Sequence, residues 1–204
     1  MRGGKISKLK CEPAMYLFFD TETTGLPKNW KAPVTDLDNW PRMIQLAYLL
    51  ADGKGKRGAG GDFIIKPAGF TIPDEAARIH GISTERALRE GKDLPAVLRE
   101  FQAAVVRAEC LVAHNLSFDE KIVGAEFLRN KLEDGLPAKK KICTMQSSTD
   151  YCALPGPYGY KWPKLIELHN KLFRTGFDEA HNAAADIAAT VKCFWELKRL
   201  GIIR

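Results

Sequence analysis

Two acidic side chains, Asp20 and Glu22, end a short apolar run at residues 14–21. Because side chains alternate along a strand, both carboxylates should project from one face, with Thr21 on the other. Unpaired carboxylates beside each other and beside a core are costly, so bound cations must compensate them. Oxygen ligands without His or Cys at metal spacing select Mg²⁺ or Mn²⁺ over zinc. Taken alone, the pair is equally compatible with acids that only cap the strand and its turn.

Two further acids and a histidine lie where helices are expected to begin. Asp119 follows a predicted strand at 110–113, and active sites of open α/β sheets gather at such strand ends. Asp186 lies in the alanine-rich segment 183–189, whose small side chains allow close approach of a helix to the sheet. His181 is expected in the loop before that helix, where an imidazole can act as a base at neutral pH. The simpler interpretations are a helix cap, a solvated helical acid and a surface histidine.

The elements that must position these residues follow an alternating pattern. Apolar runs predict five strands, at residues 14–21, 43–51, 62–66, 110–113 and 141–144. The glycine-rich stretch 53–61 suits the turn of an antiparallel hairpin, and the polar segment 27–40 suits a surface loop. Helical patterns cover residues 73–80, 94–107, 118–130, 163–173 and 183–200, with Pro163 in a first-turn position. This order predicts an α/β layer structure with a mixed sheet.

Composition narrows the class of protein. The chain has 204 residues, 45% hydrophobic and 27% charged, which is typical of a globular protein. No apolar stretch approaches the roughly 20 residues that span a bilayer, and the run after the basic start makes a poor signal peptide, so we expect a cytoplasmic protein without membrane contact. Five scattered cysteines without a C-x-x-C pair indicate reduced thiols and argue against zinc. The net charge of +6 favours a polyanionic partner, although charge runs are often only solvated surface.

Three segments together resemble the motifs of a known enzyme family. They are FDTETTGL at 19–26, HNLSFD at 114–119 and HNAAAD at 181–186. In this order they are similar to the three motifs of the DEDDh, or DnaQ-like, 3′-5′ exonuclease family, which includes the proofreading subunit of bacterial DNA polymerase III and ribonuclease T. The resemblance implies a ribonuclease H-like fold: a five-stranded mixed sheet, second strand antiparallel, with helices on both faces. We expect residues 14–204 to form a single exonuclease domain after a basic N-terminal extension at 1–13.

The same resemblance implies a mechanism and a set of site residues. Asp20, Glu22, Asp119 and Asp186 would hold two divalent ions, Mg²⁺ or Mn²⁺, about 4 Å apart. His181 would help to generate the attacking hydroxide, and nucleoside 5′-monophosphates would leave from the 3′ end. Residues that would contact the substrate are Thr23, Thr24, Gly25, Leu26, His80, Asn115 and Phe118.

The expected partner is a nucleic acid with a free 3′ end, with DNA favoured over RNA. A polymerase partner is possible, but few residues follow the last motif, so we expect no polymerase-docking segment and a free-standing enzyme. Two alternatives stay open. One is a 3′-5′ exoribonuclease, because recognition of the 2′-hydroxyl depends on pocket geometry that a sequence does not display. The other is a non-catalytic nucleic-acid-binding or polymerase-accessory module with the same fold.

Overall fold

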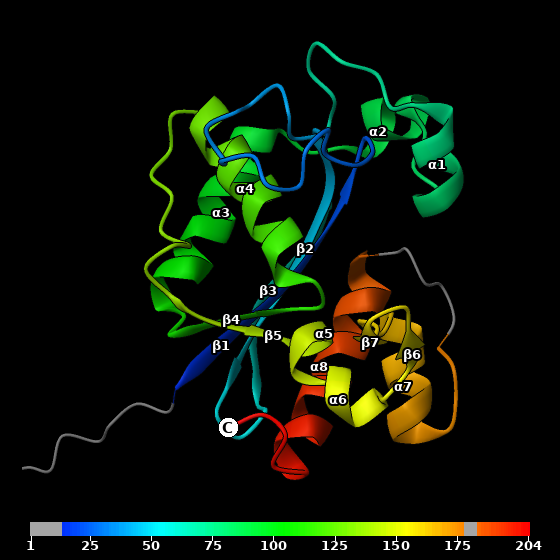
Figure 1. Cartoon of the computed structure of the whole chain (residues 1–204). Helices are drawn as coiled ribbons and strands as arrows, with labels where there is room; N and C mark the ends of the chain where they lie inside the picture. The colour runs from blue at the N-terminus through cyan, green and yellow to red at the C-terminus, as the bar shows by residue number, and fades with distance from the viewer. Residues whose placement is uncertain (1–13, 178–182) are drawn as a thin grey trace, which may run out of the picture.

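A five-stranded sheet with the order β3-β2-β1-β4-β5 forms the centre of the computed structural model, which describes residues 14–177 and 183–204 (Figure 1). The strands are β1 (Met15–Thr23), β2 (Met43–Asp52), β3 (Arg57–Ile64), β4 (Cys110–Ala113) and β5 (Lys140–Cys143). β2 is antiparallel to both its neighbours, whereas β4 is parallel to β1 and to β5. The predicted mixed sheet with an antiparallel second strand is confirmed. The extension at 1–13 and His181 lie outside the described residues.

Two long helices cover one face of the sheet, α3 (Leu94–Arg107) and α4 (Leu116–Arg129) (Figure 1). Alternation along β1 sends Leu17 and Phe19 to this face, where both are buried in the larger core cluster. Phe19 packs against Phe101 of α3 with 5.4 Å between ring centroids. Thr21 continues the same alternation and therefore faces α4.

The opposite face is covered mainly by α8 (Ala183–Arg199), with α7 (Leu165–Phe173) beside it. Phe18 of β1 points to this side and meets Phe194 of α8 edge-on, with centroids 5.1 Å apart. The part of the chain that the structure describes also contains four shorter helices: α1 (Asp74–His80), α2 (Thr84–Glu90), α5 (Thr144–Ser147) and α6 (Thr149–Cys152). The expectation of helices on both faces is confirmed.

A buried ion cluster fixes α4 to the beginning of β2. Glu126 is fully buried, and its Oε1 lies 2.8 Å from Arg42 Nε and 3.0 Å from Arg129 Nη1. The same carboxylate accepts a hydrogen bond from the Met43 N–H at 3.1 Å. A buried carboxylate is tolerated when charged partners and hydrogen bonds replace its hydration, so this cluster determines how α4 sits on the sheet.

The prediction that β3 begins at residue 62 was wrong, because the strand extends back to Arg57 through the glycine-rich stretch. A Cβ at Gly60 would lie 2.9 Å from the Tyr48 carbonyl oxygen, so glycine permits the close approach of β3 to β2. Glycine here marks a backbone contact, not a turn. The turn itself is shorter, and the Asp52 side chain accepts hydrogen bonds from the Lys54 and Lys56 N–H groups.

Other differences concern short elements. Helix α2 was not predicted, and neither was the hairpin of β6 (Pro155–Gly156) and β7 (Gly159–Tyr160). The placement of Pro163 in the first turn of a helix was wrong: it precedes Lys164, the N-cap residue of α7. The Lys164 N–H donates to the Glu167 carboxylate at 2.7 Å, and this contact begins the helix at residue 165.

Within residues 14–177 and 183–204, no helix is both long enough and apolar enough to cross a bilayer. The four cysteines that these ranges contain, Cys110, Cys143, Cys152 and Cys193, are free thiols.

Candidate active site

The acidic pair lies at the carboxyl end of β1, on the face that α8 covers. Asp20 and Glu22 continue the alternation of Phe18, so their side chains project toward α8 and away from α4. Opposite them on β2 are Ala47 and Gln45. The small side chain of Ala47, which is buried, leaves space beside Asp20 for another group.

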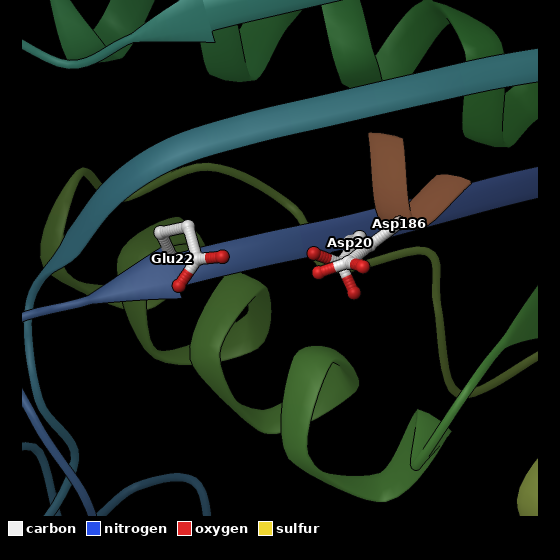
Figure 2. A group of neighbouring side chains, drawn as sticks. All are labelled: Asp20, Glu22 and Asp186. Atoms are coloured by element: carbon white, nitrogen blue, oxygen red, sulfur yellow. The ribbon is translucent and has the colours of Figure 1, made fainter. Parts of the chain in front are cut away.

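That group is Asp186, in the first turn of α8 (Figure 2). Ala183 is fully buried in the core cluster that contains Phe18 and Ala47, so the small residue at the beginning of α8 allows the helix to lie close to β1 and β2. One carboxylate oxygen from each of Asp20, Glu22 and Asp186 lies within 4.8 Å of the other two. Residues more than 160 positions apart in the chain therefore meet in one cluster.

Asp119 approaches the same strand from the opposite face. It is buried in the first turn of α4, and its Oδ1 accepts hydrogen bonds from the Thr21 N–H at 3.0 Å and from the Thr21 hydroxyl at 2.7 Å. β1 pairs with β4 only as far as Phe18, opposite Val112, so the Thr21 N–H lies beyond the parallel ladder. The Asp119 carboxylate takes the place of a backbone acceptor there.

Burial and mutual repulsion raise the pKa values of the clustered carboxylates. Burial raises the pKa of Asp20 well above its ordinary value, and the negative charges of Asp119, Asp186 and Glu22 raise it further. Burial, followed by repulsion from Asp186 and Asp119, raises the pKa of Glu22 to about 8. Burial also raises the pKa of Asp119 to about 7, although its hydrogen bonds with Thr21 oppose this shift. The cluster therefore favours either protons or cations at neutral pH.

A cavity of about 600 Å³ adjoins the cluster on the Glu22 side. Its wall combines the end of β1, the following turn, helix α1 and the beginning of α4. Six of the residues predicted to contact substrate line it: Thr23, Thr24, Gly25, Leu26, His80 and Phe118. Pro73, Glu75, Ala76 and Ile79, which sequence reasoning did not identify, complete the wall from α1 and the residue before it.

The turn after β1 is held in an unusual conformation. Gly25 has φ +148°, a region that side chains other than glycine rarely adopt. The Thr23 hydroxyl donates to the Gly25 carbonyl at 2.7 Å, and the Thr24 hydroxyl accepts from the Arg42 N–H at 2.9 Å. These bonds leave the Leu26 side chain 73% exposed at the edge of the cavity, where an apolar group can contact a ligand.

His80 and Phe118 reach this cavity from different helices, α1 and α4. His80 ends α1; its Nδ1 accepts from the Ile82 N–H at 3.2 Å, and burial lowers its pKa. Phe118 is half-buried, with the Trp30 ring 5.6 Å away between centroids. Asn115 lies elsewhere: it is the N-cap residue of α4, with φ +69°, and is not among the residues that line the cavity.

The structure also identifies a residue that sequence reasoning left without a role. Thr21 positions Asp119 through two hydrogen bonds. In the sequence, the only indication of this role was that Thr21 lies between two acids and projects to the other face of the strand. His114 and His169, for which the sequence analysis proposed no role in the site, have structural contacts. His114 lies 2.9 Å from the Pro163 carbonyl oxygen, and His169 lies 2.7 Å from that of Thr175.

A family model described as Exonuclease (RNase_T) matches residues 17–194. Among curated proteins, the uncharacterized exonuclease CP81 of Escherichia phage 186 is 28% identical over 184 residues, which cover 86% of this chain and 84% of the phage protein.

Solved structures of exonuclease I share the fold. The E. coli enzyme in complex with a dT13 oligonucleotide matches with a TM-score of 0.71 and 22% identity, over 92% of this chain and 42% of that one. A product-bound structure of exonuclease I matches with a TM-score of 0.70 and 21% identity, over 92% and 44% of the two chains. The present chain thus spans less than half the length of these proteins.

Proposed function

Because the chain belongs to this exonuclease family, we propose that it is a metal-dependent 3′-5′ exonuclease that acts on DNA and releases nucleoside 5′-monophosphates. The observation that supports this most directly is the convergence of Asp20, Glu22 and Asp186 within 4.8 Å. A cavity large enough for a nucleotide opens beside them. We further propose that residues 14–204 act as one exonuclease domain.

The carboxylates fit divalent cations. They supply only oxygen ligands, which Mg²⁺ and Mn²⁺ prefer. Within residues 14–177 and 183–204, no lysine or arginine forms an ion pair with Asp20 or Glu22, and the raised pKa values reflect this lack of compensation. We propose that Asp20, Glu22, Asp119 and Asp186 hold two such ions.

When bound, divalent ions lower the pKa of water and stabilise negative charge on a leaving oxygen. We propose that His181 accepts the proton of the attacking water. The water oxygen bonds to the phosphorus, the bond between phosphorus and the 3′-oxygen of the shortened strand breaks, and that oxygen takes up a proton. His181 suits this role because an unperturbed imidazole is a base near neutral pH.

The cavity next to Glu22 would hold the terminal nucleotide. Leu26 offers an exposed apolar side chain to a base, and Phe118 offers an aromatic ring from the beginning of α4. The buried His80 would contribute to the wall that receives the sugar. Asn115 would contact the strand outside the cavity. We propose that the free 3′ end of the strand is the end that reaches the carboxylates.

The test is hydrolysis of a single-stranded DNA oligonucleotide with a 5′ label, in Mg²⁺ or Mn²⁺, beside an RNA of the same sequence. The wild type should produce a ladder that shortens from the 3′ end, faster on DNA, and mononucleotides as product. Asp20→Asn and Asp186→Asn should each lower the rate by roughly 10³-fold or more, with folding retained.

Asp150→Asn, which changes an exposed acid on α6, is the matched control and should leave the rate unchanged. An inert wild type in both metals would refute an enzymatic function. Equal activity of the Asp20 and Asp186 variants and the wild type would refute the assignment of the site.

A further inference from the structure

A short hairpin between α6 and α7 presents three aromatic side chains to solvent. Tyr158, at its turn, is fully exposed at 103% of the reference area, while Tyr160 and Trp162 are 57% and 62% exposed. Large aromatic rings are normally buried, and three on one hairpin form a surface that requires an explanation. The three residues are called the aromatic hairpin below.

The aromatic hairpin is conformationally defined. β6 and β7 pair antiparallel, and the Lys161 N–H donates to the Leu154 carbonyl at 2.9 Å, which extends the ladder by one residue. Lys161 Nζ lies 2.6 Å from Glu167 Oε1, an ion pair that ties the hairpin to α7. Gly159 has φ +124°, which permits the tight turn. A hairpin backbone that is ordered before binding loses little conformational entropy when a ligand arrives.

A histidine connects this hairpin to the end of the sheet that carries the carboxylates. His114 directly follows β4 and precedes Asp119 by five residues. Its Nε2 lies 2.9 Å from the Pro163 carbonyl oxygen, and its Nδ1 lies 3.0 Å from the Thr144 hydroxyl. Burial lowers the pKa of His114 to about 4, so the neutral ring can donate to Pro163 at neutral pH. In Figure 1, the hairpin lies on the side of the sheet that α8 covers. Asp20 and Glu22 project to the same side, because they continue the alternation of Phe18.

We propose that the aromatic hairpin binds bases of a single-stranded nucleic acid, on the 5′ side of the nucleotide held by the carboxylates. This inference rests on the proposed function. Tyr160 and Trp162 are two residues apart, which is about 7 Å along an extended chain. A flat base that stacks between two rings needs the same spacing, because each stacking separation is about 3.5 Å. Aromatic stacking is independent of base identity, as a stepwise exonuclease requires.

The charges around the hairpin favour nucleic acid over a protein partner. Lys161 is paired with Glu167, but Lys164, beside the rings, is exposed and is in no ion pair within the described residues. Lysine is depleted in protein interfaces but attracts phosphates. The aromatic residues are also separated along the chain by Gly159 and Lys161 and do not form a continuous apolar run. Exposed rings beside a cation are typical of surfaces that bind single strands.

The test compares two triple variants. Y158A/Y160A/W162A removes the rings, whereas Y158F/Y160F/W162F keeps a ring at each position and is the matched control. Because all three side chains are exposed, both variants should retain the wild-type thermal unfolding midpoint. Rates are measured on a trinucleotide and on an oligothymidylate of about 20 nucleotides, longer than the roughly 4–16 that one small binding domain covers.

The alanine variant should show a KM for the long strand that is about 10- to 100-fold higher, with trinucleotide hydrolysis unchanged, while the phenylalanine variant stays close to wild type. Fluorescence anisotropy of the labelled long strand in EDTA, where metal-dependent hydrolysis cannot occur, should show the same loss of affinity. Unchanged affinity in the alanine variant overturns the inference, as does an equal loss in both variants.

The anisotropy measurement separates the two proposals. If the wild type binds the long strand in EDTA through the aromatic hairpin but hydrolyses nothing in Mg²⁺ or Mn²⁺, the hairpin inference holds and the proposed function fails. If the wild type hydrolyses both substrates and the alanine variant behaves like it, the proposed function holds and the hairpin inference fails.

Discussion

Replacing Glu22 with glutamine should make the metal-free protein more resistant to unfolding at alkaline pH. In the fold, the pKa of Glu22 rises from its ordinary value of 4.5 to about 8, mainly through burial and then through repulsion by Asp186 and Asp119. The folded chain therefore binds this proton more tightly than the unfolded chain does. The contribution of Glu22 to stability is fully present below about pH 4.5 and is lost as the pH rises through about 8.

The expected size of the effect follows from the shift. Each pKa unit corresponds to about 1.4 kcal/mol, so ionisation of Glu22 should cost the metal-free fold about 3–5 kcal/mol at about pH 9. Glutamine has the same shape and no charge, so the variant avoids this cost. Asp20 and Asp119 contribute to the pH dependence of both proteins, and the difference between the proteins isolates Glu22 and its coupling to them.

Urea unfolding in EDTA at about pH 5 and about pH 9 measures the difference. The wild type should lose about 3–5 kcal/mol more than Glu22→Gln between the two conditions. Added Mn²⁺ should then stabilise the wild type more than the variant, because the variant lacks one proposed ligand. Glu126→Gln is the control: it should lower stability at both pH values by unpairing Arg42 and Arg129, and keep the response to Mn²⁺.

Two results would refute this reasoning. If wild type and Glu22→Gln lose the same stability between the two pH values, neither burial nor the neighbouring carboxylates raise the pKa of Glu22 in the metal-free fold. If Glu22→Gln responds to Mn²⁺ as strongly as the wild type, Glu22 does not hold the metal.

Two further substitutions test the support of the site and of the fold. Thr21→Val removes the hydrogen bond from the hydroxyl to Asp119 and should lower the hydrolysis rate roughly 10-fold, whereas Thr21→Ser should stay close to wild type. Equal rates for Thr21→Val and the wild type would show that Thr21 does not position Asp119. Gly91→Ala should destabilise the fold by about 1–3 kcal/mol in urea unfolding, because the added Cβ would lie 2.3 Å from the Ala87 carbonyl oxygen. Gly135→Ala is the control and should leave the stability unchanged, because its Cβ would make only an ordinary contact.

The convergence of Asp20, Glu22 and Asp186 was largely predictable from the sequence. Alternation along a strand placed Asp20 and Glu22 on one face, and the alanines around Asp186 indicated close approach of its helix. Both deductions depend on local geometry that is fixed by the polypeptide backbone. The contact between Asp119 and Thr21 was not predictable, because it depends on where β4 stops pairing with β1, which is a property of the assembled sheet.

Two elements were missed for different physical reasons. The glycines of β3 signalled a turn by their conformational freedom, but their lack of a side chain is used for close packing on Tyr48. The β6–β7 hairpin has only two residues in each strand, too few for a periodic pattern. For β3, packing against another strand decided a structure that local preference left open, whereas the β6–β7 hairpin was missed because it is too short to leave a pattern.

The ion cluster at Glu126 has a consequence for how the site can move. Asp119 and Glu126 are seven residues apart on α4, so they lie on one side of the helix, two turns from each other. One contacts β1 and the other contacts the beginning of β2. Helix α4 is therefore held to the sheet at two points, and it can neither slide nor rotate without breaking one of these contacts. Any adjustment of the cavity to an incoming strand must therefore come from its other walls.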